Sequence, residues 1–167
     1  FLIFTLLPVA ASLILSTFSW DLINPPEFVG VGNYIKLFST DRMTGDPLFL
    51  QVLRQTGYYV LLTIPPGLCV SLLLATLVNQ KVRGKNVYRF FYFLPVVTSA
   101  VAVSLVWNWM YNRDFGLINE VLGMIGLKND TNWLGDVNLA MPAVAIVSIW
   151  QNAGYNMVIF LAGLQGI

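Results

Sequence analysis

The stretch GYYVLLTIPPGLCVSLLLATLVNQ, residues 57–80, decides the fold class of this chain. It contains no Asp, Glu, Lys or Arg, and it is longer than the roughly 20 residues that a helix needs to cross a hydrocarbon core. Inside lipid, a single segment can satisfy its backbone N–H and C=O groups only by forming a helix. The sequence therefore predicts a transmembrane helix here, which Pro65-Pro66 is expected to kink or locally unwind.

Three further stretches share this absence of charge and predict three more transmembrane helices. Their expected spans are residues 1–20, 90–112 and 140–163. Four spans make an all-α fold, a polytopic membrane helix bundle that forms a single transmembrane domain over residues 1–167. Phe1 and Ile167 both lie inside apolar runs, so we expect the chain to be truncated at both ends.

Composition agrees with a membrane protein and argues against several classes of function. Charged residues are 10% of the chain and apolar residues 57%, whereas about 25% of an average soluble domain is charged. The net charge of +1 gives no reason to expect a nucleic acid partner. One cysteine and no histidine exclude an intrachain disulfide framework and disfavour a zinc or haem site, so neither a metal nor a cofactor is expected.

The charges in the connections predict the orientation of the chain. The link between the second and third spans carries four basic residues and no acid: Lys81, Arg83, Lys85 and Arg89. The eight acidic residues all lie in the other two connections: Asp21, Glu27, Asp41, Asp46, Asp114, Glu120, Asp130 and Asp136. Because cytoplasmic loops are enriched in Lys and Arg, the 81–89 link and the C-terminal end are predicted to be cytoplasmic. Residues 21–56 and 113–139 are then external.

A stripe of neutral polar residues distinguishes the fourth span. Its members recur at spacings of three and four and share a helical face of about 140°: Ser148, Gln151, Asn152, Tyr155 and Asn156. Two interpretations remain open. The stripe either joins helices by hydrogen bonds, or lines a substrate pathway whose neutral donors and acceptors bind sugar hydroxyls. The absence of ionisable residues from the spans argues against a proton-coupled carrier and favours an uncharged sugar.

Three segments together resemble a known family of transporters. Residues 89–112 read RFFYFLPVVTSAVAVSLVWNWMYN and lead into FGLIN at 115–119, FVGVGNYIKL occupies 28–37, and GYNMVIFLAGLQGI occupies 154–167. In this order they resemble the permease subunit of binding-protein-dependent ABC sugar importers of the maltose and glycerol-3-phosphate type. The likeness covers nearly the whole chain and is greater to the first permease of the pair than to the second.

This resemblance implies a subunit of a multi-pass importer in a prokaryotic plasma membrane. Its partners would be a second permease in a heterodimer, two ATPase subunits inside and a solute-binding protein outside, with membrane lipid around it and a sugar as substrate. The subunit would work by alternating access and carry no catalytic residues, since ATP hydrolysis belongs to the ATPases. The family's coupling motif is expected just beyond Ile167. A secondary transporter and a non-transporting membrane scaffold remain the alternatives.

Overall fold

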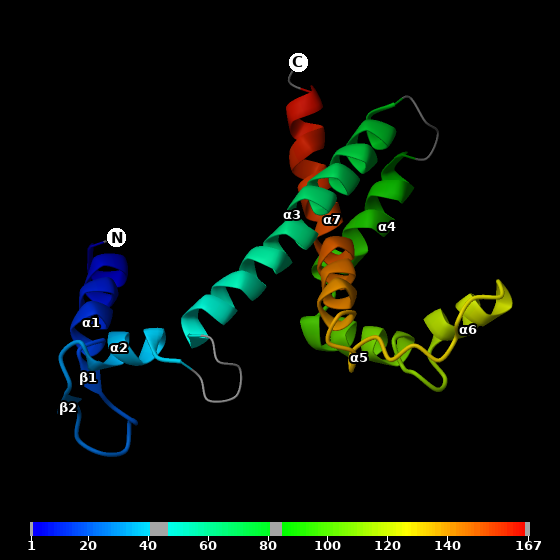
Figure 1. Ribbon diagram of the computed structural model, residues 1–167. Coiled ribbons are helices and arrows are strands. Elements are labelled where there is room, and N and C mark those ends of the chain that lie inside the picture. Colours follow the sequence, from blue (N-terminus) through cyan, green and yellow to red (C-terminus); the bar gives the residue numbers. More distant parts are fainter. Residues whose placement is uncertain (1, 41–46, 81–84, 166–167) are drawn as a thin grey trace. The chain divides into compact units, whose positions relative to one another are not determined.

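The computed structural model describes residues 2–40, 47–80 and 85–165, and helices dominate it (Figure 1). In chain order the helices are a π-helical stretch (Leu2–Leu6), α1 (Leu7–Leu15), α2 (Gly32–Phe38), α3 (Leu48–Asn79), α4 (Lys85–Val97), α5 (Ala100–Met110), α6 (Leu117–Met124) and α7 (Ala140–Gln165). Two short strands, β1 (Phe18–Ser19) and β2 (Glu27–Phe28), form a small ladder. The predicted all-α fold class is confirmed. Residues 81–84 of the basic link and 41–46 of the first acidic connection lie outside the described residues.

Among the residues that the structure describes, two helices are long and apolar enough to cross a bilayer alone: α3, with 32 residues, and α7, with 26. Residues Val87–Val97 of α4 pass the same test together with α5, as a pair bent by 97°. The apolar helix over Ile3–Leu15 is shorter. These four segments occur at the places in the sequence where the four spans are expected. Where each span enters and leaves the bilayer is still a prediction.

The third expected span is two helices rather than one, because a tight turn ends α4. The Thr98 N–H donates to the carbonyl oxygen of Pro95 at 3.3 Å, which leaves the Leu94 carbonyl without its helical donor. The Thr98 hydroxyl donates to that Leu94 oxygen instead, at 2.8 Å. Ser99 then turns to an extended conformation, and its carbonyl accepts the first bond of α5 from the Val103 N–H at 3.0 Å. Local hydrogen bonding therefore pairs three of the carbonyl groups at the break, those of Leu94, Pro95 and Ser99.

α3 continues through Pro65-Pro66 as one helix, so the local unwinding expected there does not occur. Both prolines are exposed, which keeps their rings away from neighbouring helices. The next residue, Gly67, is buried, and a Cβ at this position would only touch the Ile149 side chain of α7, at 3.9 Å. Membrane helices tolerate proline where surrounding structure supports the weakened ladder.

The first compact unit, Phe1–Gly57, contains α1, the strand ladder and α2. Phe18 of β1 packs edge-on against Phe28 of β2, with 5.3 Å between the ring centroids. Asn33 in the first turn of α2 donates through Nδ2 to the carbonyl oxygens of Ser16 and Phe18, at 2.9 and 2.8 Å. These oxygens follow the end of α1, so Asn33 joins α2 to that end.

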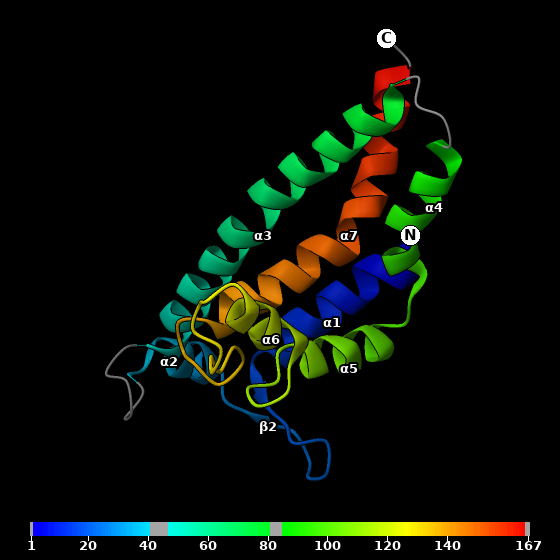
Figure 2. The ribbon, with the colours of Figure 1, turned by 90° about the vertical axis from the view of Figure 1, so that its right-hand side faces the viewer.

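The second compact unit, Tyr58–Ile167, is built around α7, with α3 and α4 beside it (Figures 1 and 2). On the α4 side, Gly154 lets the two backbones touch. A Cβ at Gly154 would overlap the carbonyl oxygen of Tyr92 and would lie 2.8 Å from its carbonyl carbon and 3.1 Å from Cα of Phe93. Small residues serve this purpose in membrane helices, because close approach increases van der Waals packing.

On the other side of α7, a dry cluster joins it to the last turns of α3. Its members are Ala75 and Val78 of α3 and Met157 and Leu161 of α7, each at most 5% exposed. All four side chains are apolar, so this end of the α3–α7 contact depends on shape and not on hydrogen bonds.

Asn119 of α6 organises the connection between α5 and α7 at the other end of this unit. Its side chain is buried, and Nδ2 donates to the carbonyl oxygens of Arg113 and Thr131 at 3.0 and 2.9 Å. Its Oδ1 accepts a hydrogen bond from Nε1 of Trp133 at 2.9 Å. One amide therefore fixes three points of the connection at once.

Candidate functional site

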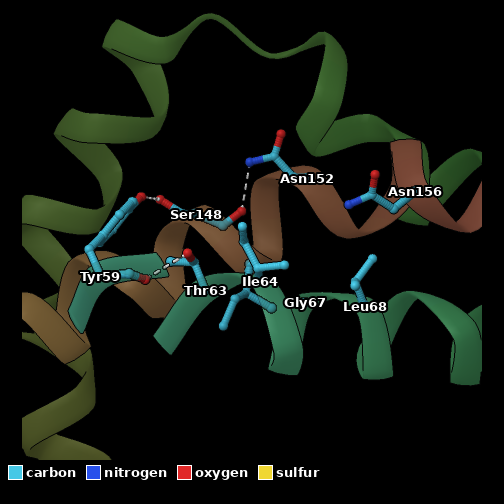
Figure 3. A pocket seen from close by; sticks show the side chains of 9 residues that line it. Tyr59, Thr63, Ile64, Gly67, Leu68, Ser148, Asn152 and Asn156 are labelled. Atoms are coloured by element: carbon cyan, nitrogen blue, oxygen red, sulfur yellow. Dashed lines mark hydrogen bonds between the residues drawn. The ribbon is translucent and has the colours of Figure 1, made fainter. Parts of the chain in front are cut away.

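A cleft of about 260 Å³ lies between α3 and α7 in the second unit (Figure 3). Nine residues line it: Tyr59, Thr63, Ile64, Gly67 and Leu68 from α3, and Ser148, Ile149, Asn152 and Asn156 from α7. The two helices run in the same direction here, so the middle turns of α3 face the middle turns of α7 (Figure 1). The dry cluster closes the contact further along both helices.

Three of the five predicted site residues form one wall of this cleft. Ser148, Asn152 and Asn156 are spaced by four, and residues with this spacing are neighbours on one helical face. Gln151 and Tyr155 do not line the cleft, and the side chain of Tyr155 is 55% exposed. The structure therefore divides the predicted stripe into a cleft-lining row and an outer row.

The opposite wall contains two polar residues that sequence analysis missed. Tyr59 and Thr63 of α3 lie one helical turn apart, and the Thr63 hydroxyl donates to the Tyr59 carbonyl at 2.7 Å. They are isolated polar groups inside a long apolar run, which gave no reason to single them out. Gly67 continues their spacing of four. This row of Tyr, Thr and Gly on one helical face is the sequence pattern that could have predicted the α3 wall of the cleft.

The three polar residues of the α7 wall differ in their hydrogen bonds. The Ser148 hydroxyl bonds the Tyr59 hydroxyl across the two helices at 2.6 Å. Asn152 donates through Nδ2 to the Ser148 carbonyl of its own helix at 2.8 Å. Asn156 has no hydrogen-bond partner among the described residues, and Figure 3 shows its amide beside the cleft. A hydrogen bond between helices thus explains why Ser148 is polar, but it does not explain why Asn156 is polar.

The cleft can offer neutral hydrogen bonds beside an apolar surface. None of its nine lining residues is charged, and Ile64, Leu68 and Ile149 provide the apolar part. Within residues 2–40, 47–80 and 85–165, no three His, Cys, Asp or Glu side chains are grouped as metal ligands would be. The chemistry of the cleft therefore suits binding of a neutral molecule that carries hydroxyl groups.

Comparison with known proteins relates the whole chain to transporter permeases. The chain is 36% identical over 168 residues to the Probable ABC transporter permease protein YesP of Bacillus subtilis, matching 100% of this chain and 52% of that protein. It is 34% identical over 179 residues to the Diacetylchitobiose uptake system permease protein NgcF of Streptomyces coelicolor, covering 100% and 49%. No protein-family model matches.

A solved structure has the same fold over the whole chain. It is the crystal structure of a bacterial alginate ABC transporter in complex with an alginate pentasaccharide-bound periplasmic protein. The TM-score is 0.77 at 23% identity, with 100% of this chain and 53% of that chain covered.

The apolar helices are those of a membrane-embedded helical protein. Over its whole length the chain is homologous to ABC transporter permease proteins, among them a carbohydrate permease, which confirms the resemblance noted in the sequence. It spans about half the length of the curated relatives it matches.

Proposed function

We propose that this chain is part of the membrane-spanning permease subunit of an ATP-driven carbohydrate importer. The observation that carries the proposal is similarity over the entire chain to permeases, one of them named for diacetylchitobiose uptake. The neutral cleft supports it, because a neutral sugar exchanges many hydrogen bonds and brings no charge of its own. The subunit itself performs no covalent chemistry.

The proposed assembly contains a second permease, two ATPase subunits and an external solute-binding protein. The periplasmic protein in the related alginate transporter structure supports the last of these partners. The charge distribution supports a prokaryotic plasma membrane location with the 81–89 link and the C-terminal end in the cytoplasm. Residues 21–56 and 113–139 would face outward. Alternating access would then present a central polar site to each side in turn.

Transport by the full-length permease, assembled with its partners in vesicles, is expected to follow ATP. Uptake of a neutral oligosaccharide should continue when the proton gradient is collapsed while the ATP concentration is held constant. The reason is that the described parts of the spanning helices contain no carboxylate suited to a proton relay near the cleft. The measurement is initial uptake of labelled sugar. Uptake that stops with the gradient at constant ATP would favour a secondary transporter.

Asn156→Ala is expected to lower uptake about tenfold, because a site built on hydrogen bonds loses affinity when one partner is removed. Assembly and thermal stability should stay unchanged, since the Asn156 amide bonds no described protein group. The matched control is Ile159→Leu on the same helix, at a side chain that is 53% exposed and does not line the cleft. Normal uptake by Asn156→Ala would show that the polar row is not the pathway.

The proposed site comprises both rows of the stripe, Gln151 and Tyr155 together with Ser148, Asn152 and Asn156. The two outer residues would contact substrate from the side that helices of the partner permease cover. Tyr155 supports this assignment, because it is a large side chain left 55% exposed in the middle of α7.

A further inference from the structure

The hydrogen bond between Tyr59 and Ser148 lies at one end of the cleft. It joins the middle of α3 to the first half of α7, with 2.6 Å between the two hydroxyl oxygens (Figure 3). Both side chains are only partly buried. A hydroxyl pair of this kind can exchange its bond for bonds to water or to a sugar hydroxyl at little net cost.

The other end of the cleft is held differently. Beyond Asn156, α3 and α7 meet through the dry cluster of Ala75, Val78, Met157 and Leu161. Separating these side chains would lose their van der Waals packing without any replacement bond, so this end is the firmer contact.

Pro65-Pro66 lies on α3 between these two ends. Two consecutive prolines remove two N–H donors from the helical ladder, and bends in helices concentrate at such positions. The helix is unbroken in this structure, yet its resistance to bending is lowest there. In chain order along α3, the arrangement is thus an exchangeable hydrogen bond, a weak point in the helix and a firm contact.

We infer that Tyr59 and Ser148 form a latch that controls entry to the cleft, with Pro65-Pro66 as the hinge of the moving segment of α3. When the bond exchanges for ligand hydroxyls, residues 58–64 of α3 can swing away from α7 while the dry cluster stays packed. Tyr59 is therefore a positioning residue for access. The inference rests on the proposed function only in taking the cleft as a transport site.

The latch can be tested by thiol labelling inside the cleft of the full-length permease in its assembled importer. Leu68 lines the cleft on α3, and a Leu68→Cys variant in a Cys69→Ala background has one thiol within residues 1–167. An impermeant maleimide is added from each side of the membrane in turn, without sugar or ATP. Tyr59→Phe should raise the initial labelling rate about three- to tenfold from the side on which Tyr59 lies, the population change expected on loss of one hydrogen bond.

Two companion variants and a control separate the latch from a general loosening. Ser148→Ala should raise the rate as much as Tyr59→Phe, and the double variant no further, because all three remove the same bond. Ser148→Thr keeps a hydroxyl and should restore the slow rate. Tyr58→Phe is the control, since Tyr58 is the neighbouring tyrosine, 47% exposed and without a hydrogen bond among the described residues.

Equal labelling rates for Tyr59→Phe and Tyr58→Phe would overturn the latch, as would additive effects in the double variant. Labelling needs neither sugar nor ATP, so the two proposals fail separately. Faster labelling in an assembly that imports no sugar would leave the latch standing and reject the proposed function. ATP-driven uptake with unchanged labelling would reject the latch alone.

Discussion

Gly154→Ala is expected to force α4 away from α7 and to cost about 1–3 kcal/mol of stability, the range for overpacking at a close contact. The added Cβ would overlap the carbonyl oxygen of Tyr92 and would approach Cα of Phe93 to 3.1 Å. Both neighbours are backbone atoms, which cannot rotate away as the end of a flexible side chain can. The measurement is the midpoint of thermal unfolding of the full-length permease in detergent, together with its recovery in the assembled importer.

The matched control is Gly163→Ala on the same helix. A Cβ at Gly163 meets nothing within 4 Å, so the substitution should be neutral or stabilise by up to about 1 kcal/mol through helix propensity. A bulkier Gly154→Val variant should be worse than Gly154→Ala. If Gly154→Ala unfolds at the same temperature as Gly163→Ala, the backbone contact between α4 and α7 does not support the bundle.

Asn119→Ala is expected to destabilise the connection between α5 and α7 by at least about 2 kcal/mol, because unpaired buried polar groups cost about 1–3 kcal/mol each. The substitution removes the bonds that Nδ2 donates to the Arg113 and Thr131 carbonyls. It also leaves the Trp133 N–H without its acceptor. Amide hydrogen exchange over residues 113–133 of the full-length permease should accelerate, while exchange in the dry cluster of α3 and α7 stays slow.

Asn138→Ala is the control for this experiment. Asn138 lies in the same connection, its side chain is exposed, and only its backbone N–H bonds Asp136, at 2.8 Å. Asn119→Asp tests the donors separately, because a carboxylate still accepts from Trp133 and cannot donate to the two carbonyls. Unchanged exchange in both Asn119 variants would mean that other contacts hold the connection together.

The sequence by itself determined the fold class and the general location of the polar site. Charge-free stretches longer than a bilayer crossing allow only helices in lipid, so the all-α class follows from composition and length. The spacing of Ser148, Asn152 and Asn156 follows in the same way from helix geometry, which is local and periodic. A shared face on α7 could therefore be predicted before any neighbour was known.

Only the tertiary structure decided which residues of that polar face on α7 lie against another helix. The neighbour of Ser148 is Tyr59, which lies 89 residues earlier, and a contact between positions so far apart leaves no periodic trace in the sequence. The same holds for Gly154, whose lack of a side chain matters because the Tyr92 backbone lies against it. The bend after α4 also depends on which carbonyl the Thr98 hydroxyl reaches. Composition determines which segments lie in lipid. Packing between segments that are distant in the sequence determines which side chains line the cleft.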